Sequence, residues 1–122
     1  MTHVSGVGVD AVDVARFGAA LDRRPAIATR LFTAGERRDG GSDVQRLAAR
    51  FAAKEATMKA LGGGIGSFGW RDVEVVRLRS GAPTLQLFAA AAALAARRGV
   101  ARWHVSLSHT ATVAIAMVVA EA

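Results

Sequence analysis

A long helix that runs directly into a glycine-rich loop is the feature that most constrains this fold. Apolar residues recur at helical spacing between Val44 and Leu61, with Leu47, Phe51 and Met58 on the inward side. Glycine fills four of the five positions from 62 to 66. These patterns predict a central helix that buries one side and ends at a loop of exposed backbone N–H groups.

Alternating and turn patterns on both sides of this helix predict an antiparallel sheet. Strands are expected at Val4–Asp10, Asp72–Arg79, Thr84–Phe88, Trp103–Ser108 and Thr112–Val119. Further helices are expected at Val12–Leu21, Ala26–Leu31 and Ala89–Arg98, and Thr33 and Glu36 form a capping-box pattern. The order β-α-α-α-β-β-α-β-β predicts an α+β fold, with a compact antiparallel sheet and a long central helix. At 122 residues the chain is expected to be one domain, residues 1–122.

The composition favours a cytoplasmic protein with its own core. Hydrophobic residues make up 52% of the chain, and there is no cysteine. The lack of thiols excludes disulfides and thiolate metal sites and, with an N-terminus unlike a signal peptide, favours the cytoplasm. The longest apolar runs, Leu85–Ala96 and Ala111–Ala120, are too short to span a bilayer, so no membrane partner is expected.

The net charge of +6 predicts an acidic binding partner. Nucleic acid, a membrane surface, a phosphate ligand and an acidic protein all fit this charge, which alone does not choose among them. Tyrosine is absent and only 6% of residues are aromatic, so the stacking platform of a single-strand nucleic-acid binder is missing. No nucleic-acid partner is therefore expected.

Charged residues near the end of the central helix suit a metal-bridged phosphate ligand. Glu55 and Lys59 are four residues apart and share one helix face, and Lys54 precedes them. A carboxylate binds a hard cation such as Mg²⁺, while lysines and loop amides bind phosphate oxygens. The alternative for Glu55 and Lys59 is an exposed ion pair worth roughly 0.3 kcal/mol.

Two further candidates for a ligand site stand at the ends of predicted strands. Asp10 leaves the first strand between small residues and either faces a ligand or caps the next helix, a role that Asp13 can also fill. His109, flanked by Ser108 and Thr110, either binds a phosphate or acts as a general base. The alternative for His109 is a turn histidine bonded to the local backbone.

Arginines lie on or just past the first predicted helix. Arg16 and Arg23 are seven residues apart and share a face, and Arg24 follows directly. This pattern predicts either a solvated face or a basic stripe for an acidic partner.

Four motifs follow one another along nearly the whole chain. They are Gly-Val-Gly-Val-Asp with a later Arg-Phe at 6–17, Phe-Thr-x-x-Glu at 32–36, Arg-Phe-Ala-Ala-Lys-Glu-Ala at 50–56, and Trp-His-Val-Ser-Leu-Ser-His-Thr at 103–110. In this order they resemble the holo-[acyl-carrier-protein] synthase family, the short-chain 4′-phosphopantetheinyl transferases. That family transfers 4′-phosphopantetheine from coenzyme A to a carrier-protein serine and releases adenosine 3′,5′-bisphosphate, so the resemblance implies a Mg²⁺-dependent transferase.

The resemblance also implies roles for individual residues. Asp10 and Glu55 would hold Mg²⁺, and Lys59 would neutralise charge on the transferring phosphate, so these three would be catalytic. The arginines Arg16, Arg23 and Arg24 would meet an acidic acyl carrier protein. The coenzyme A site would be lined by Arg50, Lys54, Lys59, Gly62, Gly63, Gly64, Gly66, Pro83, Ser108, His109 and Thr110. The base that deprotonates the serine stays open among Glu55, Glu36 and a metal-bound water.

The family forms trimers with sites between subunits, so the resemblance implies a homotrimer. Two departures from the family concern the site: the segment from Glu36 to Leu47 is shorter than in many relatives, and Ala82 stands where relatives often carry lysine or arginine. The acceptor belongs to fatty acid or polyketide synthesis.

Two other classes of function compete with the transferase. One is a catalytically silent module that binds coenzyme A or a carrier protein, and the other is a small basic nucleic-acid-binding protein. The joint presence of Asp10, Glu55 and Lys59 argues against the silent module, because binding alone does not require the metal pair.

Overall fold

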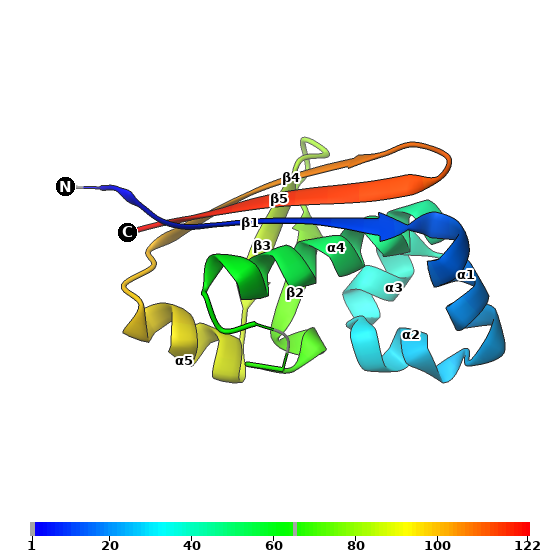
Figure 1. Cartoon of the computed structure of the whole chain (residues 1–122), viewed down its shortest axis with the longest axis horizontal. Helices are drawn as coiled ribbons and strands as arrows, with labels where there is room; N and C mark the ends of the chain where they lie inside the picture. The colour runs from blue at the N-terminus through cyan, green and yellow to red at the C-terminus, as the bar shows by residue number, and fades with distance from the viewer. Residues whose placement is uncertain (1, 65) are drawn as a thin grey trace.

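The computed structural model, which describes residues 2–64 and 66–122, arranges two sheets and several short helices around one long helix (Figure 1). The strands are β1 Val4–Asp13, β2 Val73–Arg77, β3 Pro83–Leu87, β4 Arg102–His109 and β5 Val113–Glu121. The helices are α1 Val14–Arg23, α2 Ala26–Leu31, α3 Ala34–Gly40, α4 Val44–Ala60 and α5 Ala89–Arg97, with a 3₁₀ turn at Trp70–Asp72. The α+β prediction is confirmed.

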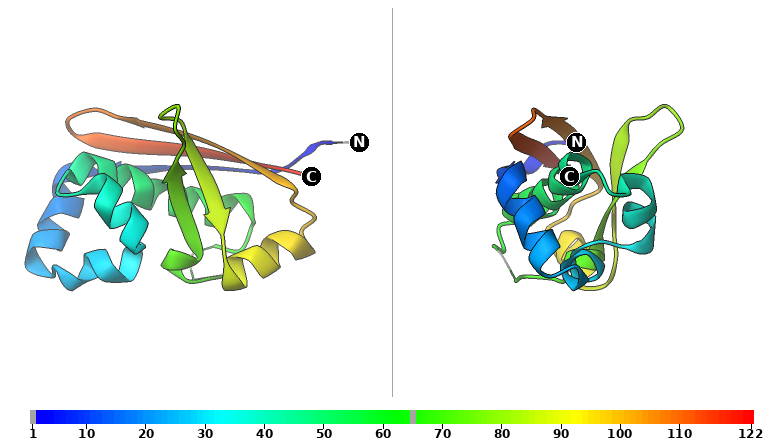
Figure 2. Two further views of the ribbon diagram at one scale, coloured as in Figure 1. Left: turned by 180° about the vertical axis from the view of Figure 1, so that it is seen from behind. Right: turned by 90° about the vertical axis from the view of Figure 1, so that its right-hand side faces the viewer.

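The strands form two antiparallel sheets where the sequence predicted one. The larger sheet has the order β1-β5-β4, and β2 pairs with β3 in a separate hairpin. The sheet and the hairpin lie on different sides of α4, as the end view in Figure 2 shows. This arrangement is possible because α4 is buried nearly all round: 11 of its 17 residues are buried, many of them alanines, which allow close packing on every side.

Strand β1 lies unusually close to α4. A Cβ atom at Gly8 would be 1.8 Å from the carbonyl oxygen of Ala56, and one at Gly6 would be 1.9 Å from that of Ala60. Only glycine fits at these two positions, because the strand backbone rests directly on the helix backbone. The contact fixes the rest of β1 relative to the C-terminal half of α4.

Local signals set several element boundaries. Asp13, not Asp10, caps α1 by accepting a hydrogen bond from the backbone N–H of Arg16 at 2.9 Å. The predicted capping box at Thr33 and Glu36 is confirmed and starts a helix of its own, α3. The chain therefore has four helices before β2, where the predicted order had three.

Helices α1 to α3 cover the N-terminal end of α4, and α5 lies at the other end (Figure 1). The buried apolar residues form two clusters, one between α4, α5 and the sheets and the other between α1, α4 and Phe32. Within the two described ranges, no helix has both the length and the apolar character needed to cross a bilayer.

Candidate active site

Asp10, Glu55 and Lys59, the carboxylate cluster, meet where β1 crosses the C-terminal half of α4. The alternation of β1 turns Asp10 toward the helix, on the same side as Gly8. Lys59 Nζ donates hydrogen bonds to Asp10 Oδ1 and to the carbonyl oxygen of Val9, both at 3.0 Å. The structure thus brings together the three residues that the resemblance assigned to catalysis.

The carboxylate cluster holds more negative charge than its own lysine balances. Burial raises the pKa of Glu55 to about 7, and the charge of Asp10 and a hydrogen bond with it add to the rise, while Lys59 opposes it. Two carboxyl groups at hydrogen-bond distance repel each other when both are ionised. A cation placed between them would remove this repulsion.

This donor set fits Mg²⁺. Magnesium binds through one or two carboxylates and completes its shell with water and phosphate oxygens, so a two-carboxylate site is sufficient. In the part of the chain that the structure describes, no group of three or more His, Cys, Asp or Glu residues is placed to hold a metal. Asp10 and Glu55 would therefore hold the ion together with oxygens of a bound phosphate ligand.

A groove of about 500 Å³ begins at Glu55 and runs along α1. It is lined by Ala11, Val12, Asp13, Arg16, Phe17, Phe51 and Glu55. Arg16, in the first turn of α1, lies on this groove, while Arg23 and Arg24 are exposed at the C-terminal end of the same helix. A ligand or partner protein could therefore reach the carboxylate cluster through this groove, along apolar side chains and the positive charge of Arg16.

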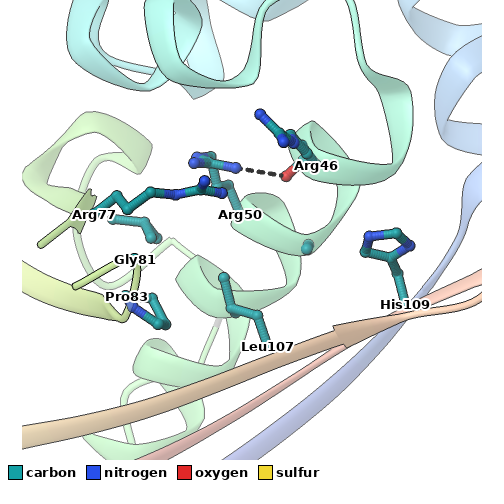
Figure 3. Close-up of a pocket in the computed structure, with 9 residues that line it drawn as sticks. Arg46, Arg50, Arg77, Gly81, Pro83, Leu107 and His109 are labelled. Carbon is teal, nitrogen blue, oxygen red and sulfur yellow. Dashed lines mark hydrogen bonds between the residues drawn. The ribbon is translucent and has the colours of Figure 1, made fainter. Parts of the chain in front are cut away.

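A second concave site, the arginine pocket, lies between α4, the β2–β3 hairpin and β4 (Figure 3). It has a volume of about 290 Å³ and is lined by Arg46, Ala49, Arg50, Val75, Arg77, Gly81, Pro83, Leu107 and His109. Three of the nine lining residues are arginines and none is acidic. Such a pocket fits a ligand with several negative charges.

Arg50 is a buried arginine whose hydrogen-bonding groups are not all satisfied. Only 3% of its surface is exposed, and its Nε has no hydrogen-bond partner among the described residues. Its Nη1 donates to the backbone carbonyl of Arg46 at 3.2 Å (Figure 3). A buried guanidinium N–H without a partner is costly in the free protein, so an anion in the pocket would relieve a deficit.

Sequence reasoning missed two of these arginines. Arg46 lies one turn before Arg50 on the same face of α4, so the helical spacing of the two residues was an available signal. Arg77 ends β2 and pairs with Pro83 across the hairpin. The sequence carried no signal that this hairpin would fold against Arg50.

Lys54 is a correction to the predicted coenzyme site. Its side chain is fully buried, and Nζ donates to Glu36 Oε1 at 2.7 Å, to the Trp70 carbonyl at 3.0 Å and to the Val73 carbonyl. Burial lowers the pKa of Lys54, while Glu36 acts in the opposite direction. Lys54 therefore ties α4 to α3 and β2 and does not line a ligand site.

The burial of Glu36 also removes one candidate for the catalytic base. Glu36 is fully buried, and its Oε2 accepts a hydrogen bond from the backbone N–H of Val75 at 2.8 Å. A serine on another protein cannot reach this carboxylate. Glu55 or a water held at the carboxylate cluster is left for this role.

The other predicted coenzyme-site residues lie in different places. Arg50, Pro83 and His109 line the arginine pocket together. Ser108 lies on the opposite face of β4 from His109 and does not line this pocket, and Thr110 accepts hydrogen bonds from the backbone of the β4–β5 turn. Gly62, Gly63, Gly64 and Gly66 follow α4 just beyond Lys59, with positive φ at 62, 64 and 66, and Ile65 of this loop lies outside the described residues.

Comparison with known proteins places this geometry in a family. The family model described as the 4′-phosphopantetheinyl transferase superfamily matches residues 6–118. A holo-[acyl-carrier-protein] synthase of Frankia casuarinae is 58% identical over 118 residues, which cover 97% of this chain and 98% of that protein.

Several solved structures with the same fold are more than 25% identical to this chain. The holo-[acyl-carrier-protein] synthase of Neisseria meningitidis matches with a TM-score of 0.88 at 32% identity, covering 97% of this chain and 98% of that one. The Helicobacter pylori enzyme, solved in complex with coenzyme A, matches with a TM-score of 0.86 at 28% identity, covering 93% and 98%. The chain belongs to the holo-[acyl-carrier-protein] synthase family of 4′-phosphopantetheinyl transferases.

Proposed function

We propose that this chain transfers the 4′-phosphopantetheine group of coenzyme A to a serine of an apo acyl carrier protein, with Mg²⁺, and releases adenosine 3′,5′-bisphosphate. The observation that carries the proposal is the Asp10–Glu55 pair, whose excess negative charge calls for a cation beside Lys59. Family membership supplies the reaction class. A silent binding module has no need for two carboxylates held against each other.

Each residue of the carboxylate cluster has a distinct task in this reaction. Asp10 and Glu55 would hold Mg²⁺, which when bound supplies positive charge to the pyrophosphate of coenzyme A. The Lys59 side chain is 53% exposed, so its ammonium is free to move from Asp10 to an oxygen of the transferring phosphate. Glu55, or a water held at the cluster, accepts the proton of the serine hydroxyl as its oxygen attacks phosphorus.

The arginine pocket is proposed to bind the anionic nucleotide end of coenzyme A. The support is its three arginines, the absence of a lining carboxylate and the unpartnered Nε of Arg50. Ala82 carries no charge at the turn of the hairpin, and Arg77 provides a guanidinium on the neighbouring strand. His109 adds a hydrogen-bond donor at the opposite wall.

The reaction is tested by following adenosine 3′,5′-bisphosphate chromatographically. We expect release from coenzyme A that requires both an apo carrier protein and Mg²⁺ and stops with EDTA. Coenzyme A binding without release under any of these conditions would instead support the silent module. The cytoplasmic location stays a prediction.

Carrier-protein docking is proposed for the basic face of α1. Arg16 lies on the groove that leads to Glu55, and Arg23 and Arg24 extend the positive charge along the helix. An acidic carrier protein that docks there would bring its serine to the groove. Charges of this kind act mainly on association, so transfer should slow as salt rises.

Reversing Arg16 and Arg23 together to glutamate should raise the KM for the carrier protein about tenfold or more and leave the KM for coenzyme A unchanged. The physical reason is that both exposed arginines meet the carrier and neither lines the arginine pocket. Steady-state kinetics with each substrate varied in turn measures this, with Arg102 and Arg97 reversed as a matched control. A rise in the KM for coenzyme A alone would place the carrier surface elsewhere.

The active site is proposed to form between subunits of a homotrimer. Asp10 of the carboxylate cluster lies on β1 and His109 of the arginine pocket lies on β4, and β1 and β4 are the two opposite edges of the larger sheet. We therefore expect one coenzyme A to bind between the carboxylate cluster of one subunit and the arginine pocket of the next. The outer face of the same sheet exposes Val7, Val9, Ile115 and Met117, as an interface between copies requires.

Subunit mixing tests this arrangement. Trimers of Glu55→Gln alone, or of Arg77→Gln with His109→Ala alone, should be nearly inactive. When the two proteins are unfolded together and refolded as a 1:1 mixture, roughly a quarter of the sites should combine two intact halves and recover activity. A mixture as inactive as its components, or a monomer by sedimentation, would show that each site lies within one chain.

A further inference from the structure

Asp39, near the end of α3, contacts all three arginines of the arginine pocket, two through its carboxylate and one through its backbone carbonyl. Its Oδ2 forms an ion pair with Arg50 Nη2 and lies 3.7 Å from Arg77 Nε. Its backbone carbonyl accepts a hydrogen bond from Arg46 Nη1 at 3.4 Å. Asp39 does not line the pocket but approaches the arginines from the side of α3.

The two partners in the Asp39–Arg50 ion pair differ greatly in exposure. The Arg50 side chain is 4% exposed and that of Asp39 is 35% exposed. Arg50 therefore depends on a counter-ion, whereas Asp39 returns to water at little cost. A neighbouring hollow of about 390 Å³, lined by Asp39 and Arg38 and sharing Arg77 and Val75 with the arginine pocket, leaves space for this movement.

The charges around Arg50 are also unequal in number. The Asp39 carboxylate pairs with two guanidinium groups, those of Arg50 and Arg77, and Arg50 Nε has no hydrogen-bond partner among the described residues. A phosphate group offers three oxygens and up to two charges, so it satisfies more of these donors than Asp39 does.

We propose that Asp39 is a built-in counter-ion of the arginine pocket. When no ligand is bound, its carboxylate neutralises Arg50, and when a ligand binds, the phosphate of that ligand replaces Asp39 as the partner of Arg50. Asp39 thereby sets the selectivity of the pocket, because only a group with more charge than one carboxylate gains by replacing it. The same contact stabilises the ligand-free protein by neutralising Arg50. This inference rests on the proposed function, which assigns the pocket to the nucleotide end of coenzyme A.

Asp39→Asn is the direct test, because it removes the charge and keeps the shape and a hydrogen-bond acceptor for Arg50. Adenosine 3′,5′-bisphosphate titrated by calorimetry should bind the variant about five- to tenfold more tightly than the wild type, because its phosphate no longer competes with a carboxylate. Adenosine, which has no charge, should show no such gain. The variant should also unfold at a lower temperature in phosphate-free buffer, and saturating bisphosphate should close that gap.

Asp43→Asn is the matched control. Asp43 also pairs with an arginine of the pocket, Arg46 at 3.6 Å, but both side chains are nearly half exposed, and asparagine still caps α4. Its effect on bisphosphate binding should be less than about twofold, as for an exposed ion pair.

The outcomes separate this inference from the function beneath it. Bisphosphate binding that is unchanged or weaker in Asp39→Asn would overturn the counter-ion role and leave the pocket assignment standing. An equal gain in bisphosphate affinity in Asp43→Asn would show that the effect comes from net charge alone, and it would also overturn the counter-ion role of Asp39. Failure of the wild type and both variants to bind bisphosphate would contradict the assignment of the pocket, and this inference with it.

Discussion

Glu55→Gln is expected to lower kcat for phosphopantetheine transfer by about a thousandfold or more at saturating Mg²⁺. Glutamine keeps the shape of the side chain but gives up the charge that Glu55 shares with Asp10 toward the cation. The pyrophosphate and the transferring phosphate then meet only Lys59 and half of a metal site. Glu121→Gln, at a partly exposed pair with Arg102 on the far end of β5, is the matched control and should keep full activity. Near-wild-type turnover of Glu55→Gln would make the metal assignment wrong.

The stability of the same variant gives a second, independent readout. Because the folded pKa of Glu55 is about 7 against an ordinary 4.5, the folded protein keeps a proton that the unfolded chain loses between these values. The contribution of Glu55 to the free energy of unfolding is therefore full below pH 4.5 and lost as the pH rises through 7. In urea unfolding with EDTA, the wild type should lose stability relative to Glu55→Gln across this window. Identical pH dependence of the two proteins would contradict the raised pKa of Glu55, which burial and the charge of Asp10 produce.

Gly8→Ala should destabilise the fold by about 3 kcal/mol or more and lower activity about a hundredfold or more in the protein that remains folded. The added Cβ would lie 1.8 Å from the Ala56 carbonyl oxygen, so β1 must move away from α4 and carry Asp10 from Glu55 and Lys59. Urea unfolding and steady-state kinetics measure the two effects.

Gly18→Ala, in helix α1, is the control substitution for Gly8→Ala in β1. Its Cβ would meet only methyl groups of Val44, at 3.2 and 3.8 Å, and alanine favours helix α1. Its stability should stay within about 1 kcal/mol of the wild type. A Gly8→Ala protein as stable and active as Gly18→Ala would show that the close packing of β1 does not position Asp10.

The parts of the fold that the sequence predicted well depend on neighbouring residues. The capping box at Thr33, the helix that begins at Ala89 and the helix that ends before Gly62 each depend on residues a few positions apart in the sequence. Strand β1 continues three residues beyond the predicted end at Asp10, because β5 keeps pairing with it as far as Asp13. No local pattern marks such an extension.

The candidate site was predictable only where its residues share one element or one motif. Glu55 and Lys59 follow from helical spacing, whereas Lys54, one position away, turns about 100° from Glu55 around α4 and meets Glu36. Arg77, Leu107 and Asp39 reach the arginine pocket or its arginines through pairings between distant segments. Such contacts follow from tertiary packing, which one sequence does not specify by pattern alone.

Mass spectrometry of a carrier protein tests the central claim most directly. Several purified apo acyl carrier proteins are each incubated with this protein, coenzyme A and Mg²⁺, and the intact mass is then measured. We expect a gain of one 4′-phosphopantetheine on the carrier serine, absent with EDTA, with Glu55→Gln or on a carrier whose serine is replaced by alanine. No mass gain on any carrier, from a protein that binds coenzyme A and Mg²⁺, would contradict the account.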